Sequence, residues 1–177
     1  MIPQVVLLDR DGVLNVDLQG SVRSLEQMRM IDGAAEAVAT LCAKGYLVLV
    51  VTNQAVVARG QLSRPALESI HRKMDSIIGE AGGRIDRWYV CDHQDADECA
   101  CRKPKAGLIE LARKDFGFDP ASTWMVGDAS RDLDAAKAGG CKAALVLTGK
   151  GPQTALAHPE VPVFATLKAF VEALPAA

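Results

Sequence analysis

The stretch VVLLDRDGVLN, residues 5–15, decides the fold. Its four consecutive aliphatic residues show no polar alternation, which is typical of a strand covered on both faces of a sheet. Two carboxylates, Asp9 and Asp11, follow this run directly, and Gly12 then allows the chain to turn. An isolated pair of this kind is more often a solvated acidic loop. Whether this pair has a function therefore depends on which other residues of the chain are predicted to lie near it.

Four further apolar runs follow, each ending in polar or glycine residues: residues 46–52, 87–91, 123–127 and 143–148. Helical patterns lie between them, at residues 33–44, from Ser63 through an apolar stripe ending at Ile78, at 105–116 and at 131–138. The tail from residue 169 is predicted to form a last helix. This alternation of strands and helices predicts an α/β fold with a doubly wound, mainly parallel, Rossmann-like sheet, in one domain spanning residues 1–177.

Length and composition limit the class of protein. A chain of 177 residues suits one domain, and a net charge of −2 gives no general basic surface for nucleic acid. The longest unbroken apolar run, residues 46–51, is too short to span a bilayer, and residues 1–11 do not resemble a signal peptide. We therefore expect a cytoplasmic protein that binds neither nucleic acid nor membranes. A monomer is the working expectation for its oligomeric state, which the sequence does not determine. Five cysteines in a reducing compartment are not expected to form a disulfide framework.

Polar residues follow four of the apolar runs, and in an open parallel sheet such strand ends share one rim where ligands bind. Asp9 and Asp11, Thr52, the segment after Cys91, and Asp128 all belong to this set. Mg²⁺ prefers a few carboxylate and carbonyl oxygens together with water. We therefore expect a Mg²⁺ site made by the Asp9 and Asp128 carboxylates and the Asp11 backbone carbonyl, which a substrate phosphate would complete.

The same residues are suited to phosphoryl transfer. A carboxylate such as Asp9 can act as a nucleophile and form an aspartyl-phosphate. Asp11, two residues further on, can then protonate the leaving alkoxide and later activate water. Lys103, in the segment CRKPK, is the best candidate for a cation that contacts the phosphoryl oxygens, and Thr52 can donate its hydroxyl.

Four segments, DRDGVLN, VTNQ, RKPK and VGDASRD, occur in this order and resemble the four signature motifs of the haloacid dehalogenase-like (HAD) phosphatase superfamily. The resemblance implies that Asp9 is the nucleophile and Asp11 the general acid/base. It also implies that Thr52 and Lys103 stabilise the phosphoryl group and that Asp128 holds Mg²⁺. Asp132 lies where the superfamily often has a second acidic residue, and the resemblance implies that it does not bind Mg²⁺ directly. Dehalogenases of the superfamily lack the second aspartate of the first motif, so phosphoryl transfer is favoured.

A cluster of cysteines and one histidine predicts a second metal site. The segment CDHQDADECAC contains Cys91, His93, Cys99 and Cys101 within eleven residues. Three cysteines and a histidine form a common structural zinc set with no open position. The alternative, four ordinary side chains, is disfavoured by their density. Such a zinc site would fix the loop that carries Arg102 and Lys103.

This loop narrows the resemblance to the zinc-loop subgroup that contains histidinol phosphatases and D-glycero-D-manno-heptose 1,7-bisphosphate 7-phosphatases. The stretches DGVLNVD, TNQAVVARGQLS and LTGKG resemble the heptose enzymes more. The chain departs from their pattern in three places: Ala55-Val56 replaces Ser-Gly, Leu18-Gln19-Gly20 replaces His-Gly-Tyr, and Ala129 replaces a lysine. The resemblance implies Mg²⁺-dependent release of the C7 phosphate, which gives heptose 1-phosphate for nucleotide-activated heptose and lipopolysaccharide synthesis.

The intervals between the motifs are too short for a large cap domain, so short loops are expected to select a small phosphorylated sugar. The predicted substrate-binding residues are Asn15, Asp17, Gln19, Gly20, Thr52, Asn53, Gln54, Arg59, Arg102 and Lys103. Of these, Asp17, Gln19 and Arg59 are equally compatible with plain surface positions. Two alternatives stay open: a phosphatase acting on histidinol phosphate or another small sugar phosphate, and a zinc-stabilised binding protein without catalysis.

Overall fold

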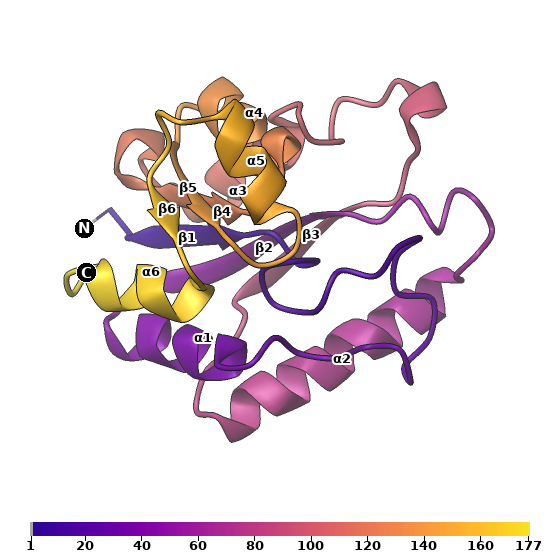
Figure 1. Ribbon diagram of the computed structural model, residues 1–177, viewed down its shortest axis with the longest axis horizontal. Coiled ribbons are helices and arrows are strands. Elements are labelled where there is room, and N and C mark those ends of the chain that lie inside the picture. The colour runs from indigo at the N-terminus through magenta and orange to yellow at the C-terminus, as the bar shows by residue number, and fades with distance from the viewer. Residues whose placement is uncertain (1) are drawn as a thin grey trace.

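The computed structural model describes residues 2–177. Six parallel strands form one sheet in the order β3-β2-β1-β4-β5-β6 (Figure 1). This order, running outward in both directions from β1, is that of a doubly wound sheet. The strands are β1 (Val5–Leu8), β2 (Leu47–Asn53), β3 (Arg87–Cys91), β4 (Trp124–Gly127), β5 (Lys142–Val146) and β6 (Val163–Phe164).

Helices cover both faces of the sheet, which explains the unbroken apolar strands. Side chains of β1 alternate between two cores, with Val6 and Leu8 in one and Val5 and Leu7 in the other. The first core lies under α1, α2 and α6, and the second under α3 and α4 (Figure 1). The helices are α1 (Ala34–Ala43), α2 (Arg64–Glu80), α3 (Gly107–Phe116), α4 (Ser130–Ala138), α5 (Gly151–Ala157) and α6 (Leu167–Ala173).

Local signals place most helix ends as predicted. The Ser63 hydroxyl accepts a hydrogen bond from the Ala66 amide at the start of α2, and a proline occupies the first turn. Helix α3 begins two residues later than predicted, and α6 begins before residue 169 and ends at Ala173, ahead of Pro175. Strand β6 was not predicted, because two residues carry no readable period.

The topology places a binding crevice beside β1. The chain runs from β1 outward to β2 and β3, and after α3 it returns to the other side of β1 to form β4. At this reversal the connections leave in opposite directions, which opens a crevice at the carboxyl ends of the two central strands. Asp9 and Asp128 directly follow β1 and β4, so they lie on either side of the reversal.

Loops, rather than a further domain, surround this crevice within residues 2–177. The segment between β1 and α1 has no helix or regular strand, but Val22 and Met28 anchor it in the core with at most 2% exposure. The connection from β3 to α3 contains only one short 3₁₀ turn, Asp95–Asp97. The expected capless architecture is therefore confirmed. Among the same residues, no helix is both long and apolar enough to cross a membrane.

Candidate active site

Three carboxylates from separate elements meet at the crevice. Asp9 follows β1, Asp128 follows β4, and Asp132 lies in the first turn of α4. All three are at most 2% exposed, and each offers an oxygen within 4.8 Å of the others'. Burying three carboxylates together is unfavourable unless cations or hydrogen-bond donors offset their charge. The surroundings of each carboxylate therefore indicate what the site is built to hold.

Lys103 supplies one of these cations. Its ammonium is 2.8 Å from Asp9 Oδ1 and 2.8 Å from Asp132 Oδ1, and it donates to the Val51 carbonyl at 2.7 Å. Burial lowers the pKa of Lys103, but the two carboxylates outweigh burial and raise the pKa above its usual value. The side chain is therefore a permanent cation next to Asp9. This placement agrees with the predicted role of Lys103, which stays a prediction.

Asp132 acts on its neighbours rather than on the crevice. One of its oxygens faces Lys103, and Oδ2 accepts hydrogen bonds from the Asp128 and Ala129 amides at 3.2 and 3.1 Å. Oδ1 thus forms an ion pair with Lys103 from the loop before α3, and Oδ2 accepts from two amides at the start of α4. A Cβ on Gly127 would lie only 2.2 Å from the Asp132 Cβ, so glycine is needed for this close packing. The carboxylate orients Lys103 and the Asp128 backbone, which agrees with its expected place outside the direct ligands.

Asp9 and Asp128 each keep one oxygen without a partner. Asp9 Oδ2 and Asp128 Oδ1 are buried and have no hydrogen-bond partner among the described residues. Burial raises the pKa of Asp9 to about 6, with Asp132 adding to the shift and Lys103 opposing it. Burial and the Asp9 charge raise the pKa of Asp128 to about 7. Two unpartnered carboxylate oxygens at this depth fit a divalent cation such as Mg²⁺.

Glycines hold the Asp128 carboxylate in place. A Cβ on Gly12 or Gly149 would lie 2.1 or 2.2 Å from Asp128 Oδ2, and both glycines have positive φ. That oxygen accepts a hydrogen bond from the Lys150 amide at 2.8 Å, and the Thr148 hydroxyl donates to the Gly12 carbonyl at 2.5 Å. The LTGKG segment therefore packs against the first motif and fixes Oδ2 of Asp128, which leaves Oδ1 as the oxygen without a partner within residues 2–177.

The Asp11 carboxylate is held by three donors. It accepts from Arg10 at 2.9 Å, from the Asn15 amide at 3.0 Å and from the Gln54 amide at 2.8 Å. Burial raises the pKa of Asp11, but the Arg10 charge and these donors outweigh burial and lower it. Asn15 and Gln54 were predicted to contact substrate, yet their amides are at most 1% exposed and point to Asp11. The structure therefore assigns them to orienting this carboxylate, and substrate contact by them stays a prediction.

Thr52 and Asn53, at the end of β2, flank the lysine. The Thr52 hydroxyl accepts from the Gln54 amide at 2.9 Å, so its own proton remains available for donation. Asn53 donates to the Lys103 carbonyl at 3.0 Å and accepts from the Lys103 amide at 3.1 Å. This two-point bridge fixes the backbone that presents the lysine. Asn53 also reaches the adjoining cavity, where it was expected.

A cavity of about 300 Å³ opens beside Asp11 and is lined by much of the predicted substrate set. Four cationic side chains surround it, and two of them, Arg131 and Lys150, were not predicted. Lys150 forms an ion pair with Asp17 at 3.4 Å. The lining residues are Asp11, Asp17, Leu18, Gln19, Gly20, Ser21, Asn53, Ala55, Arg59, Arg102, Arg131 and Lys150.

Arg131 follows Asp128 by three residues in VGDASRD, so its place at the start of α4 was readable as a cation near the rim. Its pKa is pushed down by burial but raised overall by Asp9 and the other carboxylates. Arg102 reaches the same cavity while bonded to Asp95 at 2.5 Å. A cavity this cationic, next to buried carboxylates, suits an anionic ligand.

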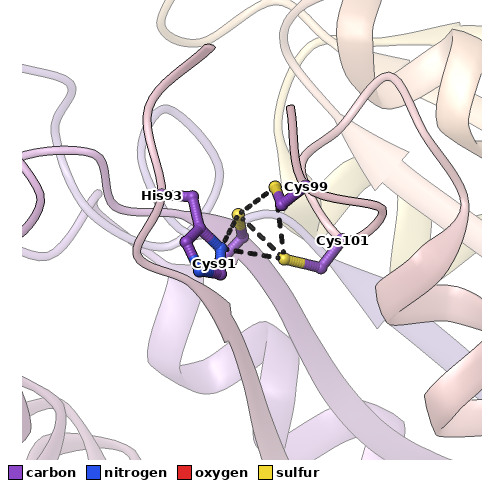
Figure 2. A group of neighbouring side chains, drawn as sticks. All are labelled: Cys91, His93, Cys99 and Cys101. Carbon is purple, nitrogen blue, oxygen red and sulfur yellow. Dashed lines mark hydrogen bonds between the residues drawn. The ribbon is translucent and has the colours of Figure 1, made fainter. Parts of the chain in front are cut away.

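The cysteine cluster has the geometry of a tetrahedral metal site. Cys91, His93, Cys99 and Cys101 point toward one another (Figure 2), and each offers a ligand atom within 4.8 Å of the others'. Neighbouring sulfur atoms are 3.2–3.7 Å apart, and His93 Nδ1 is 3.3 and 3.6 Å from two of them. A tetrahedron with Zn–S bonds of about 2.3 Å has edges of about 3.8 Å. The donor set and its spacing therefore fit zinc.

Comparison with known proteins identifies the family. A relative from Neisseria meningitidis, named D-glycero-beta-D-manno-heptose-1,7-bisphosphate 7-phosphatase, is 44% identical over 155 residues, which cover 88% of this chain and 83% of the relative. The chain belongs to this phosphatase family. A family member of the same name from Pseudomonas aeruginosa is 39% identical and is aligned over 85% of this chain and 84% of its own. The resemblance stated from the motifs is thus confirmed.

Structural comparison agrees with this family. The crystal structure of D,D-heptose 1,7-bisphosphate phosphatase from B. bronchiseptica, complexed with magnesium and phosphate, is 38% identical, covers 96% of both chains and has a TM-score of 0.92. Residues 100–173 also match the family model described as HAD-hyrolase-like. Members of this family are phosphoric monoester hydrolases of the HAD superfamily, so the predicted fold and enzyme class are confirmed.

Proposed function

We propose that this protein is a Mg²⁺-dependent phosphatase that removes the C7 phosphate of D-glycero-D-manno-heptose 1,7-bisphosphate and leaves heptose 1-phosphate. The product would supply nucleotide-activated heptose for lipopolysaccharide synthesis. The observation that carries the proposal is the position of Asp9, which has one unpartnered buried oxygen and lies 2.8 Å from Lys103. The cationic cavity beside Asp11 adds room for a second phosphate.

In the first step, an Asp9 oxygen attacks phosphorus and forms the aspartyl-phosphate while the bond from phosphorus to the sugar oxygen breaks. Asp11 gives its proton to that leaving oxygen. In the second step, Asp11 takes a proton from water, whose oxygen attacks phosphorus, so inorganic phosphate leaves and Asp9 is regenerated. The low pKa of free Asp11 suits the base role. An arriving phosphate dianion raises the pKa of a neighbouring carboxyl and favours the protonated, acidic form.

The surroundings of Asp9 stabilise the charge that develops during transfer. The Asp9 and Asp128 carboxylates and the Asp11 carbonyl would hold Mg²⁺, which would supply positive charge to offset the negative charge on the phosphoryl oxygens. Lys103 provides a second fixed cation that is already paired with Asp9. Thr52 offers a hydroxyl proton that is not donated to any group within residues 2–177. Because these groups are held in place before substrate arrives, little reorganisation is needed during the reaction.

The cationic cavity is proposed to hold the distal phosphate at C1. The Lys150 side chain is half exposed. We expect Lys150→Met to lower kcat/KM for the bisphosphate about 10-fold, because the charge-assisted contact between this ammonium and the C1 phosphate would be lost. The kcat/KM for heptose 7-phosphate, which has no second phosphate, should fall less than about 2-fold. Lys142→Met is the matched control, since this lysine lies at the amino end of β5, away from the rim. Equal losses for both substrates would contradict the assignment.

We propose that the Cys₃His cluster binds structural Zn²⁺. All four positions of a tetrahedral ion would be filled by Cys91, His93, Cys99 and Cys101, which leaves none for substrate. The loop that these residues close leads directly into Arg102 and Lys103. The ion would therefore set the position of the cations that face the crevice.

We further propose that the protein is a cytoplasmic monomer. Unpaired thiols at all five cysteines are compatible with a reducing compartment. Static light scattering with Zn²⁺ present tests the monomer assignment, and a mass of twice 18.8 kDa would contradict it.

A panel of phosphate esters tests the proposed substrate. The panel contains heptose 1,7-bisphosphate, fructose 1,6-bisphosphate, histidinol phosphate and heptose 7-phosphate, each assayed with Mg²⁺. We expect the heptose bisphosphate to have the highest kcat/KM, and ³¹P NMR of its product should show only the C1 phosphate remaining. A preference for histidinol phosphate would support the histidinol-phosphatase alternative instead. If none of the esters is hydrolysed, the alternative of a non-catalytic binding protein is supported.

A further inference from the structure

Arg10 has no part in the chemistry described above, although it lies between the two catalytic aspartates in the sequence. Its side chain is completely buried, and its guanidinium contacts two side chains within residues 2–177. Nη2 donates to Asp11 Oδ1 at 2.9 Å, and Nη1 contacts His71 Nε2 at 3.1 Å. Its Nε has no partner among these residues. The orientation of the guanidinium therefore depends on Asp11 at one end and on His71 at the other.

His71 lies on α2, 61 residues away in sequence, and is 6% exposed. An arginine only donates hydrogen bonds, so His71 Nε2 must accept here and the imidazole must be neutral. Burial, reinforced by the Arg10 charge, lowers the pKa of His71 to about 3, which keeps the ring neutral. The acceptor is thus available throughout the physiological pH range.

Trp88 of β3 holds the imidazole from its face. The two rings stack with centroids 4.1 Å apart and planes 9° from parallel. The Trp88 indole in turn donates to Asp75 at 3.0 Å, and Asp75 lies one turn of α2 beyond His71. A stacked and hydrogen-bonded ring has little freedom to rotate, so the connection from α2 and β3 to Arg10 is rigid.

We propose that His71 is a positioning residue that acts through Arg10 and holds the Asp11 carboxyl in the orientation from which it protonates the leaving alkoxide. This inference rests on the proposed role of Asp11 as general acid. Asn15 and Gln54 also bind the Asp11 carboxylate, so loss of His71 leaves it bound but turned. Within residues 2–177, His71 forms no hydrogen bond with Asp9 or Lys103, which pair with each other, so attack on phosphorus itself is left intact.

This arrangement predicts an effect that depends on the leaving group. A sugar alkoxide is strongly basic and must receive a proton as it departs, whereas 4-nitrophenolate is weakly basic and departs without one. The ratio kcat/KM covers binding and the steps through leaving-group departure, so it isolates this proton transfer from later hydrolysis of the aspartyl-phosphate. A defect confined to acid catalysis therefore lowers kcat/KM for the sugar phosphate and largely spares 4-nitrophenyl phosphate.

The test compares His71→Leu with His71→Gln, both in the zinc-loaded protein with Mg²⁺. Leucine removes the acceptor, and we expect kcat/KM for heptose bisphosphate to fall about 10- to 100-fold, since small misplacements of a catalytic group have effects of this size. The value for 4-nitrophenyl phosphate should fall less than about 3-fold. The Gln side-chain oxygen can replace Nε2 as the acceptor, so His71→Gln should restore most of the sugar-phosphate activity.

Ile78→Ala is the matched stability control, because Ile78 is fully buried two turns further along α2. In this control, a general loss of folded protein should lower kcat/KM for both substrates equally. If His71→Leu also lowers kcat/KM for both substrates equally, the positioning role is overturned. Equal activities of the Gln and Leu variants would also overturn it. If His71→Leu does not fold, His71→Asn provides the same comparison, because its shorter amide does not reach Arg10.

Asp11→Asn separates this inference from the proposed function on which it rests. A selective loss of sugar-phosphate activity in Asp11→Asn, without one in His71→Leu, refutes the role of His71 and leaves Asp11 as the acid. No selective loss in Asp11→Asn refutes the acid role itself. Selective losses in both variants, with recovery in His71→Gln, support the full connection from α2 to the leaving group.

Discussion

Replacing Asp9 by Asn is expected to lower kcat for heptose bisphosphate by at least ~10⁴-fold, because a carboxamide cannot form the aspartyl-phosphate. The two side chains have nearly the same shape, and Asp9 lies in a pocket defined by Lys103 at 2.8 Å and by the backbone end of β1. The variant is therefore expected to fold. Steady-state phosphate release with saturating Mg²⁺ measures the effect, and differential scanning calorimetry checks the fold.

Asp134→Asn provides the control for this substitution. Asp134 undergoes the same chemical change on the exposed side of α4, so it reports any general effect of losing one aspartate. We expect its kcat to stay within about 2-fold of the parent, as for most surface substitutions. An Asp9→Asn variant that keeps a tenth or more of the parent kcat would show that Asp9 is not the nucleophile.

Removal of zinc is expected to have the second largest effect. The three cysteines and His93 enclose one point between β3 and α3, and the intervening loop has no helix beyond one 3₁₀ turn. Without the ion, repulsion between thiolates and the lack of local packing favour an open loop. We expect the free energy of unfolding to fall by about 4 kcal/mol. Activity should fall as well, because this loop carries Lys103.

A chelator titration measures this effect, with thermal unfolding and hydrogen exchange of residues 91–103 as readouts. Cys99→Ser should reproduce the chelated state, since serine is a poor zinc ligand. Cys42→Ser is the matched control, because Cys42 is a half-buried free thiol that donates to the Arg84 carbonyl and bonds to no other cysteine within residues 2–177. A metal-free protein with unchanged melting temperature, exchange and activity would contradict a structural zinc site.

The central part of the fold could be predicted because its signals are local. The five predicted apolar runs form the five longer strands, and the polar residues after four of them meet at one rim as expected. Strand β6 escaped prediction because Val163 and Phe164 form too short a run to show a period. The pairing of β6 with β5 is decided by tertiary packing rather than by its own sequence.

The carboxylates, the lysine and the cysteine cluster of the site were also readable, because each belongs to a short motif with a chemical reason for its spacing. The contacts between one motif and another could not be read from the sequence. Nothing local indicates that Asp132 would bind Lys103, or that Asn15 and Gln54 would point to Asp11 rather than to the cavity. Such choices depend on how separate strands place their ends together.

Residues that join the site from a distance were the hardest to predict. His71 reads as part of the apolar face of α2, and only the fold brings it to Arg10. Lys150 follows a glycine in a segment that, by itself, is an ordinary turn, yet its amide binds Asp128. Both residues are far in sequence from their partners, and a histidine or a lysine at such a position usually has only a structural role. Their spacing therefore does not indicate that they belong to the site.

The most direct measurement of the central claim is a rapid-quench experiment with Asp11→Asn and 4-nitrophenyl [³²P]phosphate. This variant lacks the base for the second step, while its leaving group departs without an acid. We predict a burst of nitrophenolate matched by protein-bound ³²P, which peptide mapping locates on Asp9 and hydroxylamine releases. A nitrophenolate burst without bound phosphate, or with the label on another residue, would contradict transfer of the phosphoryl group to this carboxylate.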